Sequence, residues 1–469
     1  MVIQLFLYSP IGFVQSYVNT LSDTLSDQGY KLSSKQKFFM GILLSVILLC
    51  NRICWSDVEL TTMGKVTSKG VWWMYAKSNI PWDALFSSSV QMMLKMYGLS
   101  EGVLTIDDTE NSRSKKTPLI AYTHKYYDKK SGGFKNGQEL VFMVLVTSKI
   151  TIPVGFAFYE LDPTIEAWKK SNAKLIKEGV SKKDRPKRPA PSEDYRSKTQ
   201  LAAKLVRDFK DRFPDFKIQA VLADALYGSN TFYDDISSEV PQLISHLKKD
   251  QNITYFDSSY TLEKFFGSVF KPIEITIKIR GGSDQKVMYR AVRVHVNAHG
   301  CKRFVIALKY EGQSEYRYLV ASNLSWRGQD ILNAYTLRWL VEVFFEDTKA
   351  NGGWFNMAKQ QGVDGSEKTL TLSLLLDHCM LCHPEQKALI ENKLPAYTAG
   401  SLRVLVSMHS TIDFTNEIIS QPNPGERLSE ALDSLTKVVK LRISSKHMSG
   451  RNLGRLEETA SLKRYSKVA

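Results

Sequence analysis

The sequence predicts a mixed α/β protein whose sheet begins about one hundred residues into the chain. Three apolar segments there have the residue types of strands: VLTIDDT at 103–109, LVFMVLVTS at 140–148 and TIPVGFAFYEL at 151–161. Helical spacing at 198–213 precedes a fourth strand, FKIQAVLADALYG at 216–228. Acidic residues end the first and fourth of these strands. Three strands, a helix and a further strand are the order of an RNase H-like fold, and we expect that fold here.

Residues 1–98 are expected to form a helical N-terminal domain. Ser33 and Ser34 precede a long apolar run, and serine is a preferred N-cap. Ser56 and Ser68 are candidate caps for two shorter helices. Three short helices in succession are compatible with a helix-turn-helix DNA reader. A purely structural helical cap is the alternative.

The remaining chain divides by pattern. Residues 99–244 are expected to form the first part of the RNase H-like core, and 245–326 are expected to be a β insertion because IEITIKI at 273–279 alternates strictly. The core is expected to resume at 327–360 with one long helix. Residues 361–469 are expected to be a helical C-terminal region with a basic tail and a possible role in dimerisation.

Composition limits the partners. Lys and Arg total 63 against 48 Asp and Glu, a formal net charge of +15, which favours a polyanionic partner over a membrane. A merely basic soluble protein is the alternative from charge alone. Five cysteines in a long chain favour reduced thiols and a cytoplasmic setting. The opening MVIQLFLYSPIGF has no positive n-region, so no signal peptide is expected, and the longest apolar run is too short to span a bilayer.

One helix carries an unusual polar stripe. In YTLRWLVEVFFEDTK, Tyr335, Arg338, Glu342 and Lys349 fall within about 60° of one another at about 100° per residue. A carboxylate can hold a metal ion and the cations can hold phosphates. A solvated charged helix face is the alternative when this helix is considered by itself.

The strand-end acids strengthen the metal interpretation. Carboxylates from two strands and a later helix can converge on one point. Two Mg²⁺ ions about 4 Å apart would there activate a water or a 3′-hydroxyl for attack on a phosphodiester. Hard oxygen ligands suit Mg²⁺, and Mn²⁺ is expected to substitute.

These motifs resemble a known family. The spacing Y-x2-R-x3-E-x6-K at 335–349 is similar to the YREK signature of DDE transposases of the insertion-sequence-4 family. IDDT at 106–109 resembles the family's first catalytic motif, and LADALYG at 222–228 resembles its second. The resemblance covers about residues 100–355, including the β insertion.

The resemblance implies specific roles. Asp108, Asp224 and Glu342 would be the catalytic metal ligands, and Tyr335, Arg338 and Lys349 would contact phosphates at the transposon end. The partners would be double-stranded DNA, both terminal inverted repeats and target, and a second copy of the chain in a synaptic homodimer. The setting would be the nucleoid in a prokaryotic cytoplasm. Whether the reaction would pass through a hairpin intermediate stays open, because the sequence contains no Trp between Trp168 and Trp326, the stretch that includes the insertion.

The first strand offers two adjacent acids. Neighbouring strand residues point to opposite faces, so only one of Asp107 and Asp108 can reach the metals. Expected burial does not distinguish Asp107 from Asp108, because both faces of a central strand can be covered. The family resemblance selects Asp108, the acid directly before Thr109.

Other interpretations stay open. The chain could be an inactive end-binding protein or inhibitor derived from a transposase, or another RNase H-fold nuclease. The motif HCMLCH at 378–383 could bind zinc, but its position at the end of an apolar run favours a helix end with buried thiols.

Overall fold

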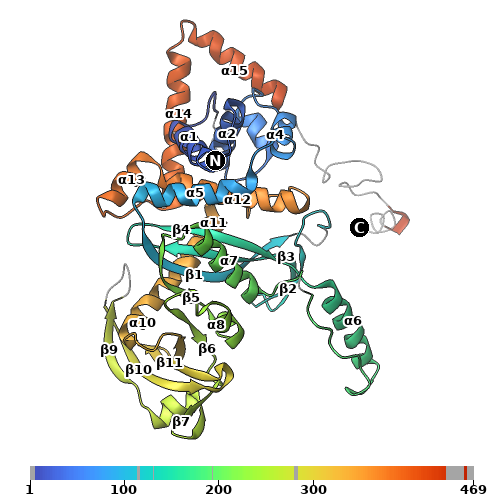
Figure 1. Ribbon diagram of the computed structural model, residues 1–469. Coiled ribbons are helices and arrows are strands. Elements are labelled where there is room, and N and C mark those ends of the chain that lie inside the picture. Colours follow the sequence, from blue (N-terminus) through green and yellow to red (C-terminus); the bar gives the residue numbers. More distant parts are fainter. Residues whose placement is uncertain are drawn as a thin grey trace.

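The computed structural model describes residues 6–113, 117–129, 131–192, 194–278, 284–356, 358–439 and 459–461. Figure 1 shows a large sheet with a helical region stacked on one end. That region begins with α1 (Gly12–Ser26), α2 (Ser34–Cys50), α3 (Trp55–Thr61), α4 (Ser68–Ala76) and α5 (Trp82–Tyr97).

Local capping explains the start of α2. Ser33 accepts a hydrogen bond from the backbone N–H of Gln36, and the Gln36 side chain returns one from the backbone of Ser33. The expected start of this helix is therefore confirmed. Within the described residues, no single helix meets the length and hydropathy of a membrane span, although α2 and α3 pass together as a pair bent by 94°.

The first half of the sheet has the topology expected of an RNase H-like core. Its strands are β1 (Glu101–Arg113), β3 (Gly133–Val146), β4 (Thr151–Tyr159), β5 (Lys217–Ala223) and β6 (Leu243–Leu247). They lie in the order β4-β3-β1-β5-β6, with β1, β3 and β4 antiparallel and β1, β5 and β6 parallel. The predicted mixed α/β class is confirmed, and β2 (His124–Asp128), which was not predicted, pairs with β3.

The β insertion continues the same sheet. β12 (Arg317–Ala321) pairs with β6, and the order runs on through β11 (Cys301–Tyr310) and β10 (Asp284–Val296). The outer strands are β7 (Asn252–Tyr255), β8 (Ser258–Thr261) and β9 (Ile273–Lys278). The insertion therefore uses the free edge of β6 and buries backbone groups that would otherwise form an open edge.

Helices cover the sheet on both faces. The helices between β4 and β6 are α6 (Pro163–Lys177), α7 (Lys198–Arg212) and α8 (Asn230–Ile236), and α6 projects away from the body in Figure 1. After the insertion come α10 (Gly328–Tyr335), a 3₁₀ turn at Thr336–Arg338 and α11 (Trp339–Asn351). The long helix expected here therefore consists of two α-helices joined by a 3₁₀ turn, and Arg338, the last residue of that turn, bonds Asp107 of β1.

The C-terminal helices complete the helical region. They are α12 (Gly362–Leu381), α13 (Pro384–Glu391), α14 (Ala399–Ile419) and α15 (Pro424–Val438), and α12 packs against α5 and α2. Figure 1 shows α15 and the upper end of α14 farthest from the sheet, while α14 also contacts α11. The predicted basic tail after residue 439 lies outside the described residues except for 459–461.

Candidate active site

The middle of β1 and the end of β5 bring acids from distant parts of the sequence together, because β1 continues past its two acids to Arg113. In the parallel β1–β5 pair, Ile106 lies beside Ala223, so Asp107 and Asp224 are the next residues in register. Asp224 directly follows β5, and its carboxylate accepts a 2.8 Å hydrogen bond from the backbone N–H of Leu226. That bond caps the following 3₁₀ turn and holds the carboxylate at the strand end.

Arg338 joins an acid of β1 to an acid of α11. Its Nη1 donates to Oδ2 of Asp107 at 2.9 Å, and its Nη2 donates to a carboxylate oxygen of Glu342, one helical turn later. The Arg338 side chain is only 16% exposed, so these charge-assisted bonds are shielded from solvent. Glu342 is therefore placed on the sheet side of α11, close to Asp107.

Asp108 has a separate set of partners. Its Oδ2 accepts from Nζ of Lys198 at 2.5 Å, and the same ammonium donates to Glu139 at 2.6 Å. Glu139 also pairs with Nε2 of His124 at 2.7 Å. Burial opposes the charge on Glu139, but these hydrogen bonds outweigh it and lower the pKa of Glu139 to about 2.

The two acids of β1 and the acid that follows β5 influence one another's pKa. Burial, and next the charge of Asp224, raise the pKa of Asp107 to about 7, although Arg338 acts in the opposite direction. Burial also raises the pKa of Asp224, and the charge of Asp108 adds to this effect. Perturbed carboxyl groups gathered in this way are typical of functional sites.

The remaining predicted residues lie along the same helical segment. The Tyr335 hydroxyl donates to the backbone oxygen of Ala223 at 3.0 Å, directly before Asp224. The ring of Tyr335 lies 4.9 Å from that of His246, whose pKa burial lowers to about 4. Lys349, at the end of α11, has its Nζ 5.6 Å from the centre of the Phe355 ring.

Four residues of this neighbourhood were not predicted from the sequence: His124, Glu139, Lys198 and His246. Each is separated in sequence from the acids it approaches, and no local motif marks it. For Lys198 a local motif is present nearby. Lys198 begins α7 directly after the N-cap Ser197, whose side chain accepts a hydrogen bond from the backbone N–H of Gln200. That position predicts a helix start but not the partner of the side chain.

The donor chemistry suits a hard divalent cation. Asp107, Asp224 and Glu342 offer only carboxylate oxygens, which Mg²⁺ and Mn²⁺ prefer. The mutual repulsion of the acids would be relieved by a cation. Among the described residues, however, no group of three His, Cys, Asp or Glu side chains is gathered closely enough to hold a metal ion. Arg338 instead occupies the space between Asp107 and Glu342.

The HCMLCH residues lie elsewhere, at the end of α12. His378 is buried and contacts the Ser89 hydroxyl at 2.7 Å and the backbone oxygen of Pro153 at 2.9 Å. Cys379 is buried, and Cys382 lies 3.8 Å from the sulfurs of Met93 and Met96. These side chains join α12 to α5 and β4.

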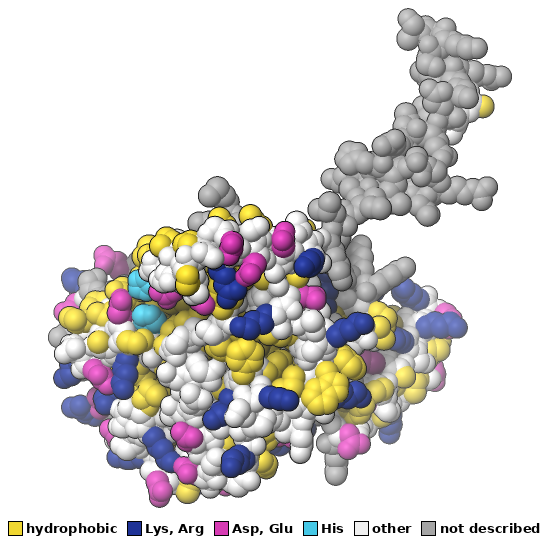
Figure 2. Space-filling view, turned by 90° about the horizontal axis from the view of Figure 1, so that it is seen from above, with side chains coloured by type: hydrophobic (Ala, Val, Ile, Leu, Met, Phe, Trp, Pro, Cys, Tyr) yellow, Lys and Arg dark blue, Asp and Glu magenta, His cyan; other side chains and the backbone are white. Residues whose placement is uncertain are grey.

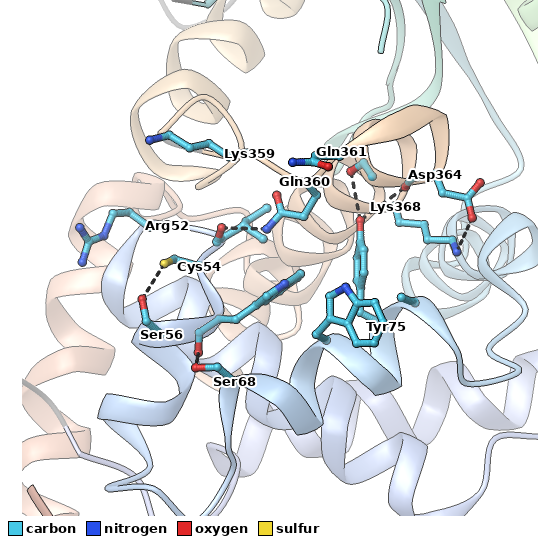
Figure 3. A pocket seen from close by; sticks show the side chains of 15 residues that line it. Arg52, Cys54, Ser56, Ser68, Tyr75, Lys359, Gln360, Gln361, Asp364 and Lys368 are labelled. Carbon is cyan, nitrogen blue, oxygen red and sulfur yellow. Dashed lines mark hydrogen bonds and ion pairs between the residues drawn. The ribbon is translucent and has the colours of Figure 1, made fainter. Parts of the chain in front are cut away.

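A cavity of about 750 Å³ lies between α3, α4 and the start of α12 (Figure 3). Its wall includes Trp72 and Tyr75, whose hydroxyl donates to the backbone oxygen of Gly365 at 3.0 Å. Lys368 pairs there with Asp364 at 2.8 Å. None of the predicted catalytic residues lines this cavity.

Comparisons with known proteins bear on the first part of the site. A family model described as DDE superfamily endonuclease matches residues 64–258, which is less than half of the chain. The matched stretch includes Asp107, Asp108 and Asp224 and ends before Glu342. No curated protein sequence matches the chain.

Solved structures are also similar to the chain. One of them is the cryo-EM structure of a piggyBac transposase synaptic complex with hairpin DNA, with 8% sequence identity and a TM-score of 0.38 over 93% of this chain and 86% of that chain. This score is too low to establish a shared fold. The chain thus resembles a DDE superfamily endonuclease over residues 64–258, and the insertion-sequence-4 subgroup stays a prediction.

Proposed function

We propose that the chain is a DDE transposase: a metal-dependent DNA endonuclease that cuts at terminal inverted repeats and joins the 3′ ends to target DNA. One observation carries this proposal. The parallel pairing of β1 with β5 puts Asp107 beside Asp224, and Arg338 connects Asp107 to Glu342 of α11. The family match over 64–258 supports the endonuclease part.

The protein's own residues have distinct tasks in this reaction. Two divalent ions, when bound, would lower the pKa of the attacking hydroxyl and stabilise the leaving oxygen. The backbone N–H of Leu226 holds the Asp224 carboxylate in one orientation. Tyr335 fastens the helical segment to β5 through the backbone oxygen of Ala223. Arg338 is positioned to exchange its carboxylate partners for a phosphate when metal neutralises the acids.

The test is incubation of the protein with DNA that carries the repeats flanking its gene, in Mg²⁺, with EDTA as control. We expect cuts at the repeat ends and products joined to a target plasmid. Binding without cutting would instead indicate an end-binding protein. Cutting without joining would indicate another nuclease of this fold.

Phosphate contacts predict a change in salt dependence. Figure 2, which views the molecule from its helical end, shows Lys and Arg side chains scattered among Asp and Glu. Replacement of Lys349 or Arg338 with Ala should lower the slope of log affinity against log salt by about one counterion. Fluorescence anisotropy across a salt series measures this slope. An unchanged slope in both variants would show that these side chains face protein in the complex.

The C-terminal tail predicts an effect on pairing. Residues 437–467 are rich in Lys and Arg, and a synaptic homodimer needs contacts between two chains on two DNA ends. Removal of the chain after residue 440 should reduce paired-end complexes more than single-end complexes. Native gels with one labelled and one longer end separate the two species. Equal amounts of paired complex in the full and shortened proteins would contradict this role.

A further inference from the structure

Strand β1 presents its two adjacent acids to different surroundings. In the antiparallel β1–β3 pair, Asp107 lies opposite Phe142 and Asp108 lies opposite Val141. Directly opposed residues share a face of the sheet, and neighbours in one strand point to opposite faces. The side chains that contact Phe142 therefore identify the helix on the Asp107 face of the sheet, and those that contact Asp108 identify the helix on the opposite face.

The face of Asp107 is the face of α11. The Phe142 ring packs edge-on against Phe344 and Phe345 of α11, each with ring centres 5.6 Å apart. Arg338, at the start of this helix, bonds Asp107 directly and also bonds Glu342. The predicted third acid therefore lies on the same side of the sheet as Asp107.

Asp224 belongs to this face as well. Asp107 follows Thr105 by two residues on β1, and Asp224 follows Leu222 by two residues on β5, where Thr105 and Leu222 are paired in register. Leu222 packs in the core cluster that contains Ile331 of α10. Alternation from Leu222 directs Asp224 to the side of α10 and α11.

The face of Asp108 is the face of α7. Asp108 is paired with Lys198, the first residue of α7, and through it with Glu139. Asp108 already has a cation from its own side of the sheet. To reach Glu342, it would have to leave that cation and cross the plane of its own strand.

From this geometry we propose that Asp107, and not Asp108, is the metal ligand contributed by β1, together with Asp224 and Glu342. Asp108 is a positioning residue that ties β1 to α7 through Lys198. This inference rests on the proposed metal-dependent function. It departs from the choice that the family resemblance makes, in which the acid directly before Thr109 binds metal.

The decisive experiment compares Asp107→Asn with Asp108→Asn in the full-length protein. Mn²⁺ binding is measured by electron paramagnetic resonance of the free ion, without DNA and without turnover. Cleavage of end-containing DNA is measured in parallel. Asp107→Asn should weaken Mn²⁺ binding at least about 100-fold, because a direct ligand contributes more than the outer-shell partners of a metal site. Asp108→Asn and Lys198→Ala should each weaken Mn²⁺ binding by about tenfold or less, because they act on the site only through the position of β1.

Folding is controlled by circular dichroism. If Asp107→Asn fails to fold, localised backbone cleavage by bound Fe²⁺ and peroxide in the unmodified protein provides a second measurement. Cuts at 107 and 224 with none near 198 support the inference, whereas cuts near 198 overturn it. Loss of Mn²⁺ binding in Asp108→Asn, or in both variants equally, also overturns it. An unmodified protein that neither binds Mn²⁺ nor cuts DNA refutes the proposed function itself.

Discussion

Asp224→Asn and Glu342→Gln should each reduce nicking of end-containing DNA by at least about 1,000-fold, while binding of the DNA end stays within about tenfold. Both substitutions keep the shape of the side chain but remove the charge that a divalent cation needs. Asp224 is held at the end of β5 by the Leu226 N–H, so the amide would keep the strand end in place. Single-turnover nicking and anisotropy binding measure the two effects separately.

Matched controls are available on the same elements. Glu346→Gln changes an exposed acid one turn beyond Glu342 on α11, and Asp215→Asn changes an exposed acid just before β5. Both should nick at close to the rate of the unmodified protein. A Glu342→Gln protein that still nicks at a normal rate would remove Glu342 from the site, whatever its position.

Arg338→Ala should destabilise the protein in EDTA by roughly 2 kcal/mol, between the values typical of exposed and of buried ion pairs. Its loss leaves Asp107 without the cation that opposes the charge of Asp224. Asp107 would then be a shielded carboxylate with acidic neighbours only, which is costly. Chemical denaturation in EDTA measures the effect, and Arg338→Lys should restore part of it, because one ammonium cannot form both bonds equally well.

The stabilisation of each variant by added Mn²⁺ tests whether Arg338 and a metal ion compete for the same position. If Arg338 occupies the position where a cation is needed, Mn²⁺ should stabilise Arg338→Ala more than it stabilises the unmodified protein, because binding to the folded state adds stability. The control is Arg327→Ala, which removes an exposed arginine paired with Asp330 at the start of α10. Equal stabilisation of all three proteins by Mn²⁺ would show that Arg338 and the metal do not compete.

Much of the fold follows from local pattern. Apolar runs with acids at their ends predict β1 and β5, and the helical spacing at 198–213 predicts α7. Ser33 and Gln36 form the capping box that starts α2. These features depend on residues close together in sequence, where propensity, capping and periodicity act directly. The strands of the insertion are predictable for the same reason, but their attachment to the edge of β6 is not.

The sequence by itself determined the class of fold, the acids that follow the apolar residues of β1 and β5, and the presence of Glu342 and Arg338 on one helical segment. It did not determine that β1 continues past its acids to Arg113. It also determined that Asp107 and Asp108 point to opposite faces, because alternation is a property of any strand. Only the tertiary structure decided which helix covers each face: α11 with Arg338 and Glu342 beside Asp107, and α7 with Lys198 beside Asp108. That choice depends on contacts between residues 90 apart, as for Asp108 and Lys198, or 231 apart, as for Asp107 and Arg338, and no local pattern encodes them.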